Sequence, residues 1–118
     1  MKYTDRQRLE RICDYCSKLL TYISDSGLTR EMIMEDYAAQ WTVTTPLYNI
    51  GEHTYNLSSE MKQSHPEIPW AKISGLRHRL VHSYDNTNWS IIVQVIFEEL
   101  WDFYRDVEAI LKNDTDIQ

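Results

Sequence analysis

Apolar residues return at every third or fourth position along most of this 118-residue chain, and this spacing limits its fold more than any other feature. Such spacing gathers apolar side chains on one face of an α-helix. It predicts a first helix over residues 5–24 and a last one from Asn88 to Lys112. No segment of useful length shows the alternation typical of a strand. The stripe of the last helix comprises Ile92, Ile96, Leu100, Phe103, Val107 and Ile110.

Three further helices are predicted between these two. A short one runs from Thr29, its cap, to about Ala39, and a long one from about Thr42 to Gln63. Another begins at Pro69 and ends at Val81 or Ser83, because proline is well tolerated in the first turn of a helix. Gly51 lies beside the apolar stripe of the third helix, where a glycine lowers helix stability, so we expect it to permit close approach of a neighbour.

The expected fold is therefore all-α: an up-and-down helical bundle of four long helices plus one short helix. The length fits a single domain over residues 1–118, with a core of about 5–112 and a frayed tail over 113–118. The net charge of −6 argues against a general polyanion binder. The chain contains no apolar run of the ~20 residues that span a bilayer, and MKYTDRQRLERIC does not resemble a signal peptide, so a cytoplasmic protein is expected.

The two cysteines, Cys13 and Cys16, form a C-x-x-C pair that raises the question of a zinc or redox site. Zinc would need two further ligands, and no second cysteine pair or histidine hook lies at the spacing of a zinc finger. A redox motif would need a strand followed by a helix, whereas this pair falls on the apolar face of the first helix. We interpret both as core cysteines packed as small hydrophobic residues.

The segment from Ile68 to Tyr84 contains no acidic residue, although the chain as a whole is acidic. On a helix, His78 and His82 share a face because they are four residues apart. Arg77 and His82 are five apart, or about 140° around the axis, and a long guanidinium can cover that angle. Tyr84 follows the last turn. The basic residues of the segment are Lys72, Arg77, His78, Arg79 and His82.

These residue types suit the binding and cleavage of a phosphodiester. Arginine offers a planar fork to phosphate oxygens, and histidine can move protons near pH 7. The sequence lacks a carboxylate cluster to hold Mg²⁺, so we expect no metal or other cofactor. Cleavage without metal uses the 2′-OH of RNA as nucleophile and needs a base, an acid and a cation, which a symmetric dimer would supply twice over. Two plainer interpretations stay open: a solvated basic helix end, and a fortuitous metal pair of His78 and His82.

The stretch RHRLVHSY fits the pattern R-x4-H-x-Y, with Arg77, His82 and Tyr84 at its defined positions and the polar His78 after the arginine. Three other segments accompany this pattern in the sequence. They are a corner with two prolines, HPEIPW (65–70), the lead-in GLR (75–77), and NIGEHTYNLSSEMK (49–62) in the preceding helix. Over about residues 5–112 the chain resembles the HEPN superfamily, and its HepT-like branch most closely. R-x4-H alone is a weak pattern, but the extended motif between the corner and a long last helix is fairly specific.

The resemblance implies an α-helical homodimer whose motif helices form a composite cleft, and a metal-independent endoribonuclease that acts as the toxin of a toxin–antitoxin pair. It implies that Arg77 binds the scissile phosphate, that His82 is general base or acid, and that His78 orients groups or supplies the second proton. Arg79 and Lys72 are candidate contacts to RNA phosphates. Tyr84 is the implied site of AMPylation by a minimal nucleotidyltransferase (MNT) antitoxin, which would silence the toxin.

A second function from a different class also fits the resemblance. A HEPN dimer can bind a nucleotide or its nucleotidyltransferase partner without cutting RNA. The acidic net charge favours this alternative, or else a narrow substrate such as one exposed RNA loop of a tRNA, whereas the intact set of Arg77, His82 and Tyr84 favours the nuclease.

Overall fold

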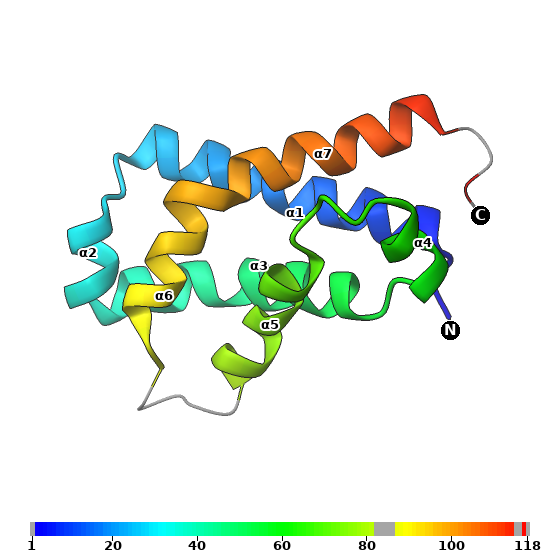
Figure 1. Cartoon of the computed structure of the whole chain (residues 1–118). Coiled ribbons are helices and arrows are strands. Elements are labelled where there is room, and N and C mark those ends of the chain that lie inside the picture. Colours follow the sequence, from blue (N-terminus) through cyan, green and yellow to red (C-terminus); the bar gives the residue numbers. More distant parts are fainter. Residues whose placement is uncertain (1, 82–86, 115–116, 118) are drawn as a thin grey trace.

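The structure is a computed structural model that describes residues 2–81, 87–114 and 117 (Figure 1). All of its elements are helical, and no strand occurs among these residues. The predicted all-α fold is confirmed. None of the described helices is both long and apolar enough to cross a bilayer. The elements are α1 (Asp5–Ser26), α2 (Arg30–Glu35), α3 (Tyr37–Tyr55), α4 (Ser59–Ser64), α5 (Trp70–Val81), α6 (Trp89–Gln94), the π-helical segment η1 (Val95–Glu99) and α7 (Leu100–Asn113).

Helix α3 forms the middle of the bundle, with α1 packed on one side of it and α5 on another (Figure 1). Helix α7 runs along α1, and α2 covers the end of the molecule where α6 begins. Burial of the predicted stripes supplies the apolar area that drives folding. The largest fully buried side chains are Phe103, Leu9, Ile12, Ile33, Leu47, Ile50, Ile73, Leu76, Ile92, Leu100, Val43 and Val107.

The start of α1 follows from its sequence. Thr4 caps it, because the threonine hydroxyl accepts from the Gln7 amide at 3.1 Å and the Gln7 side chain accepts from the Thr4 amide at 3.0 Å. This reciprocal pair is a capping box. Gly27, with φ of 71°, ends the helix in the left-handed region that glycine adopts without steric cost. At the other end of the chain, the Arg6 guanidinium donates to the carbonyls of Asp114 and Ile117.

The predicted third helix, Thr42 to Gln63, is wrong at both ends. It begins earlier, as α3, because the Asp36 side chain accepts from the Ala38 amide at 2.9 Å and caps it. It also stops at Tyr55, and a separate helix, α4, follows. Ser58 caps α4 by accepting from the Met61 amide, and Asp5 accepts from both the amide and the hydroxyl of Ser58. That contact spans 53 residues, so local pattern did not reveal it.

The predicted last helix is interrupted by η1, whose π-helical hydrogen bonds join residues five apart instead of four. Two neighbouring carboxylates of η1 form ion pairs with two different helices, α2 and α5. Glu98 accepts from Arg30 at 3.0 Å, and Glu99 pairs with Lys72 of α5 at 3.0 Å. The apolar stripe stays buried on both sides of η1, which explains why the sequence periodicity gave no sign of it.

Gly51 permits the close approach that its position predicts. A Cβ on Gly51 would lie 2.7 Å from the backbone nitrogen of Arg77 and 3.2 Å from the carbonyl oxygen of Ile73. Both atoms belong to the backbone of α5, so they cannot move aside without shifting the helix. The absence of a side chain at Gly51 therefore sets the spacing of α3 and α5 at the point where Arg77 leaves the backbone.

Gly51→Ala is expected to destabilise the fold by about 1–3 kcal/mol, because the added methyl group overpacks a rigid contact. Gly75→Ala is the matched control: it lies within α5, and a Cβ there would meet nothing within 4 Å. That change should stabilise the protein by about 0.5–1 kcal/mol through helix propensity. Urea unfolding of both variants measures the difference, and equal effects of the two substitutions would contradict the close approach.

The cysteine pair lies in the core, as predicted. Cys16 is fully buried and Cys13 half-buried against the same cluster, and both are free thiols. Burial raises the pKa of Cys13 to about 12, with Glu108 and Glu10 adding to the effect, and burial raises the pKa of Cys16 as well. The thiolate is the reactive form of cysteine, so neither residue is suited to redox chemistry at neutral pH.

Candidate functional site

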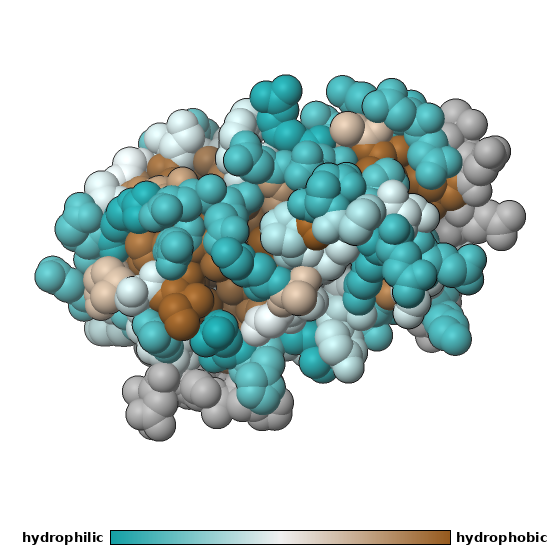
Figure 2. All heavy atoms as spheres, in the orientation of Figure 1, coloured by the Kyte–Doolittle hydropathy of each residue, from teal (hydrophilic) through white to brown (hydrophobic). Residues whose placement is uncertain are grey.

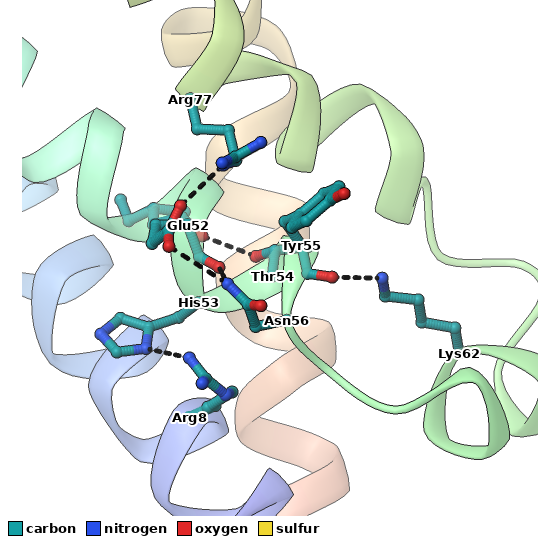
Figure 3. A network of polar contacts seen from close by, with 9 residues as sticks. Arg8, Glu52, His53, Thr54, Tyr55, Asn56, Lys62 and Arg77 are labelled. Atoms are coloured by element: carbon teal, nitrogen blue, oxygen red, sulfur yellow. Dashed lines mark hydrogen bonds and ion pairs between the residues drawn. The ribbon is translucent and has the colours of Figure 1, made fainter. Parts of the chain in front are cut away.

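Arg77 projects from the last turns of α5 toward the C-terminal end of α3 (Figure 3). Its Nε donates to Oε1 of Glu52 at 2.6 Å, and its guanidinium carbon lies 4.3 Å from the ring centroid of Tyr55. The second oxygen of Glu52 accepts from the Asn56 side chain at 3.2 Å. A carboxylate and an aromatic face thus fix the plane of the guanidinium.

The pairing has a clear electrostatic consequence. The hydrogen bond to Glu52 raises the pKa of Arg77, with smaller contributions of the same sign from Tyr55 and Tyr48. The side chains of Arg77 and Glu52 are each 35% exposed, so the pair is open to solvent. Glu52 occupies the Nε edge of the fork, which leaves the terminal nitrogens to bind a second anion from solvent. Such a geometry suits a phosphate oxygen.

Two other basic residues of α5, Lys72 and Arg79, lie on the side that faces α6 and η1 and not beside Glu52 and Tyr55. His78 and Arg79 are exposed, and Lys72 pairs with Glu99 on the side of α5 that faces η1. Lys72 and Arg79 line one hollow of about 170 Å³ between α5, α6 and η1, together with Glu99. Of the two predicted phosphate contacts, Lys72 is therefore already engaged by a carboxylate.

His82 and Tyr84 lie outside the described residues. The structure describes α5 as far as Val81 and resumes at Thr87, just before α6. The reach of Arg77 to His82, and the place of Tyr84 beside them, stay predictions.

Sequence reasoning missed Glu52 and Tyr55. The segment around Arg77 is free of carboxylates along the chain, but α3 brings a carboxylate to it in space. The signal lay in Gly51: if this glycine packs against α5, the residue after it and the residue one turn later lie at the edge of the same contact. Figure 3 shows Glu52 and Tyr55 on that edge.

His53, the residue after Glu52 in α3, is buried. Nη1 of Arg8 donates to Nδ1 of His53 at 3.2 Å (Figure 3). Tyr3 meets the imidazole edge-on at 5.3 Å between centroids, and Tyr15 stacks on it at 6.4 Å. Arg8 thus ties α1 to α3 one residue away from Glu52.

This environment predicts a pH dependence of stability. Burial lowers the pKa of His53 from its ordinary value of 6.5, and Arg8 and Arg11 lower it further, against a small opposing effect of Glu52. The unfolded chain then binds the proton more readily than the folded one. The unfolding free energy should therefore fall as the pH drops below about 6.5.

The measurement is urea unfolding of the wild type and of His53→Gln between pH 8 and pH 5. We expect the wild type to lose more stability over this range than the variant, which has no group to titrate at this position. The remaining histidines are common to both proteins and cancel in the difference. Parallel curves would contradict a depressed pKa at His53.

The chain is similar to known proteins over almost its whole length. The family model described as ribonuclease HepT-like matches residues 6–110. "Putative RNase TTE0752" of Caldanaerobacter subterraneus subsp. tengcongensis is 31% identical over 111 residues, which cover 94% of this chain and 97% of that protein. "Putative RNase MJ0127" of Methanocaldococcus jannaschii is 26% identical, over 92% of this chain and 88% of its own length.

A third relative carries the family's name. "Probable ribonuclease HepT" of Thermococcus cleftensis is 32% identical over 76 residues, or 61% of this chain and 69% of that protein. No solved structure matches the chain. Because the family model covers nearly the whole chain and a full-length relative exceeds 30% identity, the protein belongs to the ribonuclease HepT-like family.

Proposed function

We propose that the protein is the toxin of a toxin–antitoxin pair, a metal-independent endoribonuclease that cleaves RNA, with tRNA as the first substrate to test. The observation that carries the proposal is the fixed guanidinium of Arg77, held by Glu52 and Tyr55 at the start of the R-x4-H-x-Y motif. A preorganised cation is what a phosphodiester requires as charge develops on its oxygens. Membership of a ribonuclease family supports the same reaction class.

In the proposed reaction a general base removes the proton of a ribose 2′-OH. The resulting alkoxide attacks the adjacent phosphorus, the bond to the 5′-oxygen of the next nucleotide breaks, and a general acid protonates that oxygen. The products are a 2′,3′-cyclic phosphate and a 5′-hydroxyl. His82 serves as base or acid, and His78 or the second copy of His82 supplies the other proton. Arg77 binds the phosphate.

The proposed active form is a homodimer that apposes two motif helices, because one protomer carries few groups for both proton transfers. Arg79, exposed on α5, is a further candidate for RNA contact. The proposed partner is an MNT-type nucleotidyltransferase antitoxin that transfers AMP to Tyr84.

A non-catalytic role as a nucleotide- or antitoxin-binding dimer is the alternative. The pairing of Arg77 with Glu52 favours it in one respect, since the carboxylate cancels part of the positive potential that would attract a polyanion. The net charge of −6 acts in the same direction.

Cleavage of a tRNA pool in EDTA by wild type, Arg77→Ala and His82→Ala separates the two functions. The nuclease proposal expects cleavage by the wild type and loss in both variants. Cleavage of equal rate in all three would trace the activity to a contaminant. No cleavage by the wild type, together with retained binding of nucleotide, would favour the non-catalytic role.

A further inference from the structure

Trp41 is the most exposed large apolar side chain described in the chain, with 70% of its surface open to solvent. It lies in the second turn of α3 and packs edge-on against Tyr37, with ring centroids 4.7 Å apart. The contact fixes the indole from one side and leaves much of its surface accessible. An ordered, accessible aromatic face is the element on which unpaired bases stack.

The indole borders a hollow of about 240 Å³ between the start of α3, the end of α5 and the start of α6. Sites for whole drug-sized ligands measure roughly 300–1,000 Å³, so this one suits a fragment such as a single nucleobase. Trp89, half-buried in α6, supplies a second aromatic wall. The lining residues are Gln40, Trp41, Thr44, Thr45, Leu80, Thr87 and Trp89.

The lining contains no carboxylate, although acidic residues outnumber basic ones by 18 to 12 in the chain. Four other hollows on the described surface each include at least one aspartate or glutamate. The hollow beside Trp41 therefore presents no carboxylate that would repel a phosphate-linked ligand.

Two polar side chains of the lining, Gln40 and Thr44, retain acceptor oxygens. The side-chain amide nitrogen of Gln40 donates to the carbonyls of Ile33 at 2.9 Å and Met34 at 3.4 Å, so the group that Gln40 can present is its amide oxygen. The Thr44 hydroxyl donates to the Gln40 carbonyl at 2.7 Å and so offers an acceptor as well. Acceptors of this kind match the N–H groups of nucleobases.

The hollow is also lined by residues on either side of positions 82–86, which contain His82 and Tyr84 and lie outside the described residues. These lining residues are Leu80 and Thr87. The Thr87 hydroxyl donates to the carbonyl of Arg79 at 3.4 Å, which ties the two ends together. Leu80 is about one helical turn after Arg77, so the hollow lies beside the helix that carries Arg77.

We propose that this hollow is a base-binding subsite, in which one unpaired nucleobase of a single-stranded RNA stacks on Trp41 and is walled by Trp89. The inference rests on the proposed ribonuclease function and gives it a substrate class: unpaired RNA, such as a loop, rather than duplex. Such a subsite would let an acidic protein hold RNA, because the stacking of a base on an aromatic face needs no positive charge on the protein.

The test is binding of a fluorescently labelled, adenosine-rich 2′-O-methyl oligonucleotide in EDTA, followed by anisotropy at fixed low salt. The probe has no free 2′-OH and cannot be cut. Trp41→Ala should weaken its Kd about tenfold or more, and Trp41→Phe, which keeps an aromatic face, should stay within about threefold of wild type. Trp101→Ala is the matched control: Trp101 is 54% exposed on α7, and its loss should change the Kd less than twofold.

A Kd unaffected by Trp41→Ala overturns the subsite, as does a wild type that fails to bind the probe. Gel filtration accompanies the titration, and a changed oligomeric state in Trp41→Ala would assign this face to self-association instead. His82→Ala separates the two proposals. If Trp41 governs binding and neither wild type nor His82→Ala cuts RNA, the subsite stands and the nuclease fails; if His82-dependent cleavage coexists with Trp41-independent binding, the subsite alone fails.

Discussion

Arg77→Lys is expected to lower the rate of RNA cleavage by at least about 100-fold, although it keeps the positive charge. Lysine has no Nε to donate to Glu52 and no planar group to stack on Tyr55, so both contacts that fix Arg77 are lost. The ammonium group also cannot offer a fork to two phosphate oxygens. Initial rates on a tRNA pool measure the effect.

Glu52→Gln is the companion variant, because it keeps an oxygen that can accept from Nε of Arg77 while removing the charge. We expect a smaller loss than in Arg77→Lys, of about tenfold, since the guanidinium loses orientation but not its function. Both side chains are partly exposed, so the melting temperature should change little in either variant. Full activity of Arg77→Lys would show that a point charge suffices, and that the contacts to Glu52 and Tyr55 have no catalytic consequence.

AMPylation of Tyr84 is expected to lower the rate of RNA cleavage at least as much as Arg77→Lys does. Incubation with ATP, Mg²⁺ and an MNT-type nucleotidyltransferase, the proposed antitoxin, should add one adenylyl group to Tyr84 with release of pyrophosphate, and should reduce RNA cleavage to background. The added group carries a phosphodiester charge and a base, so it would compete with RNA for Arg77 and for the hollow beside Trp41. Intact-mass and peptide mass spectrometry locate the modification, and cleavage assays measure its effect.

Tyr84→Phe provides the control. The variant should resist silencing by the antitoxin, since phenylalanine has no hydroxyl to accept the adenylyl group. Growth arrest on expression should then persist in the presence of the active nucleotidyltransferase. Arrest that the antitoxin relieves equally in wild type and variant would place the modification elsewhere or replace it with simple binding.

The sequence predicted the helical class and most of the core because its apolar stripes are long and have one period. The start of α1 and the close approach at Gly51 also depend on local chemistry, namely a capping box and a missing side chain. The break between α3 and α4 depends instead on Asp5, which is remote in sequence. Figure 2 shows that hydrophilic side chains dominate one face of the molecule, with apolar patches over the end where α2 and α6 lie, as the stripes imply.

The surroundings of Arg77 could be predicted only in part, for the same physical reason. Arg77 stands out in the sequence because its motif is contiguous along the chain. Its partners Glu52 and Tyr55 lie on another helix, and their contact depends on the depth of packing at Gly51. The burial of His53 could not be predicted either, because a polar side chain within a helix is normally solvated, whereas Arg8, Tyr3 and Tyr15 together satisfy and cover it here.

The central proposal is that the protein cleaves RNA by using the 2′-OH of the RNA as the nucleophile, with Arg77 and His82 as the essential groups. The most direct measurement is the chemistry of the new ends made from a defined RNA in EDTA. The account predicts a 2′,3′-cyclic phosphate on one fragment and a 5′-hydroxyl on the other, and no cleavage where the 2′-OH next to the scissile phosphate is methylated. A 5′-phosphate end, or cleavage that survives the methylation, would contradict it.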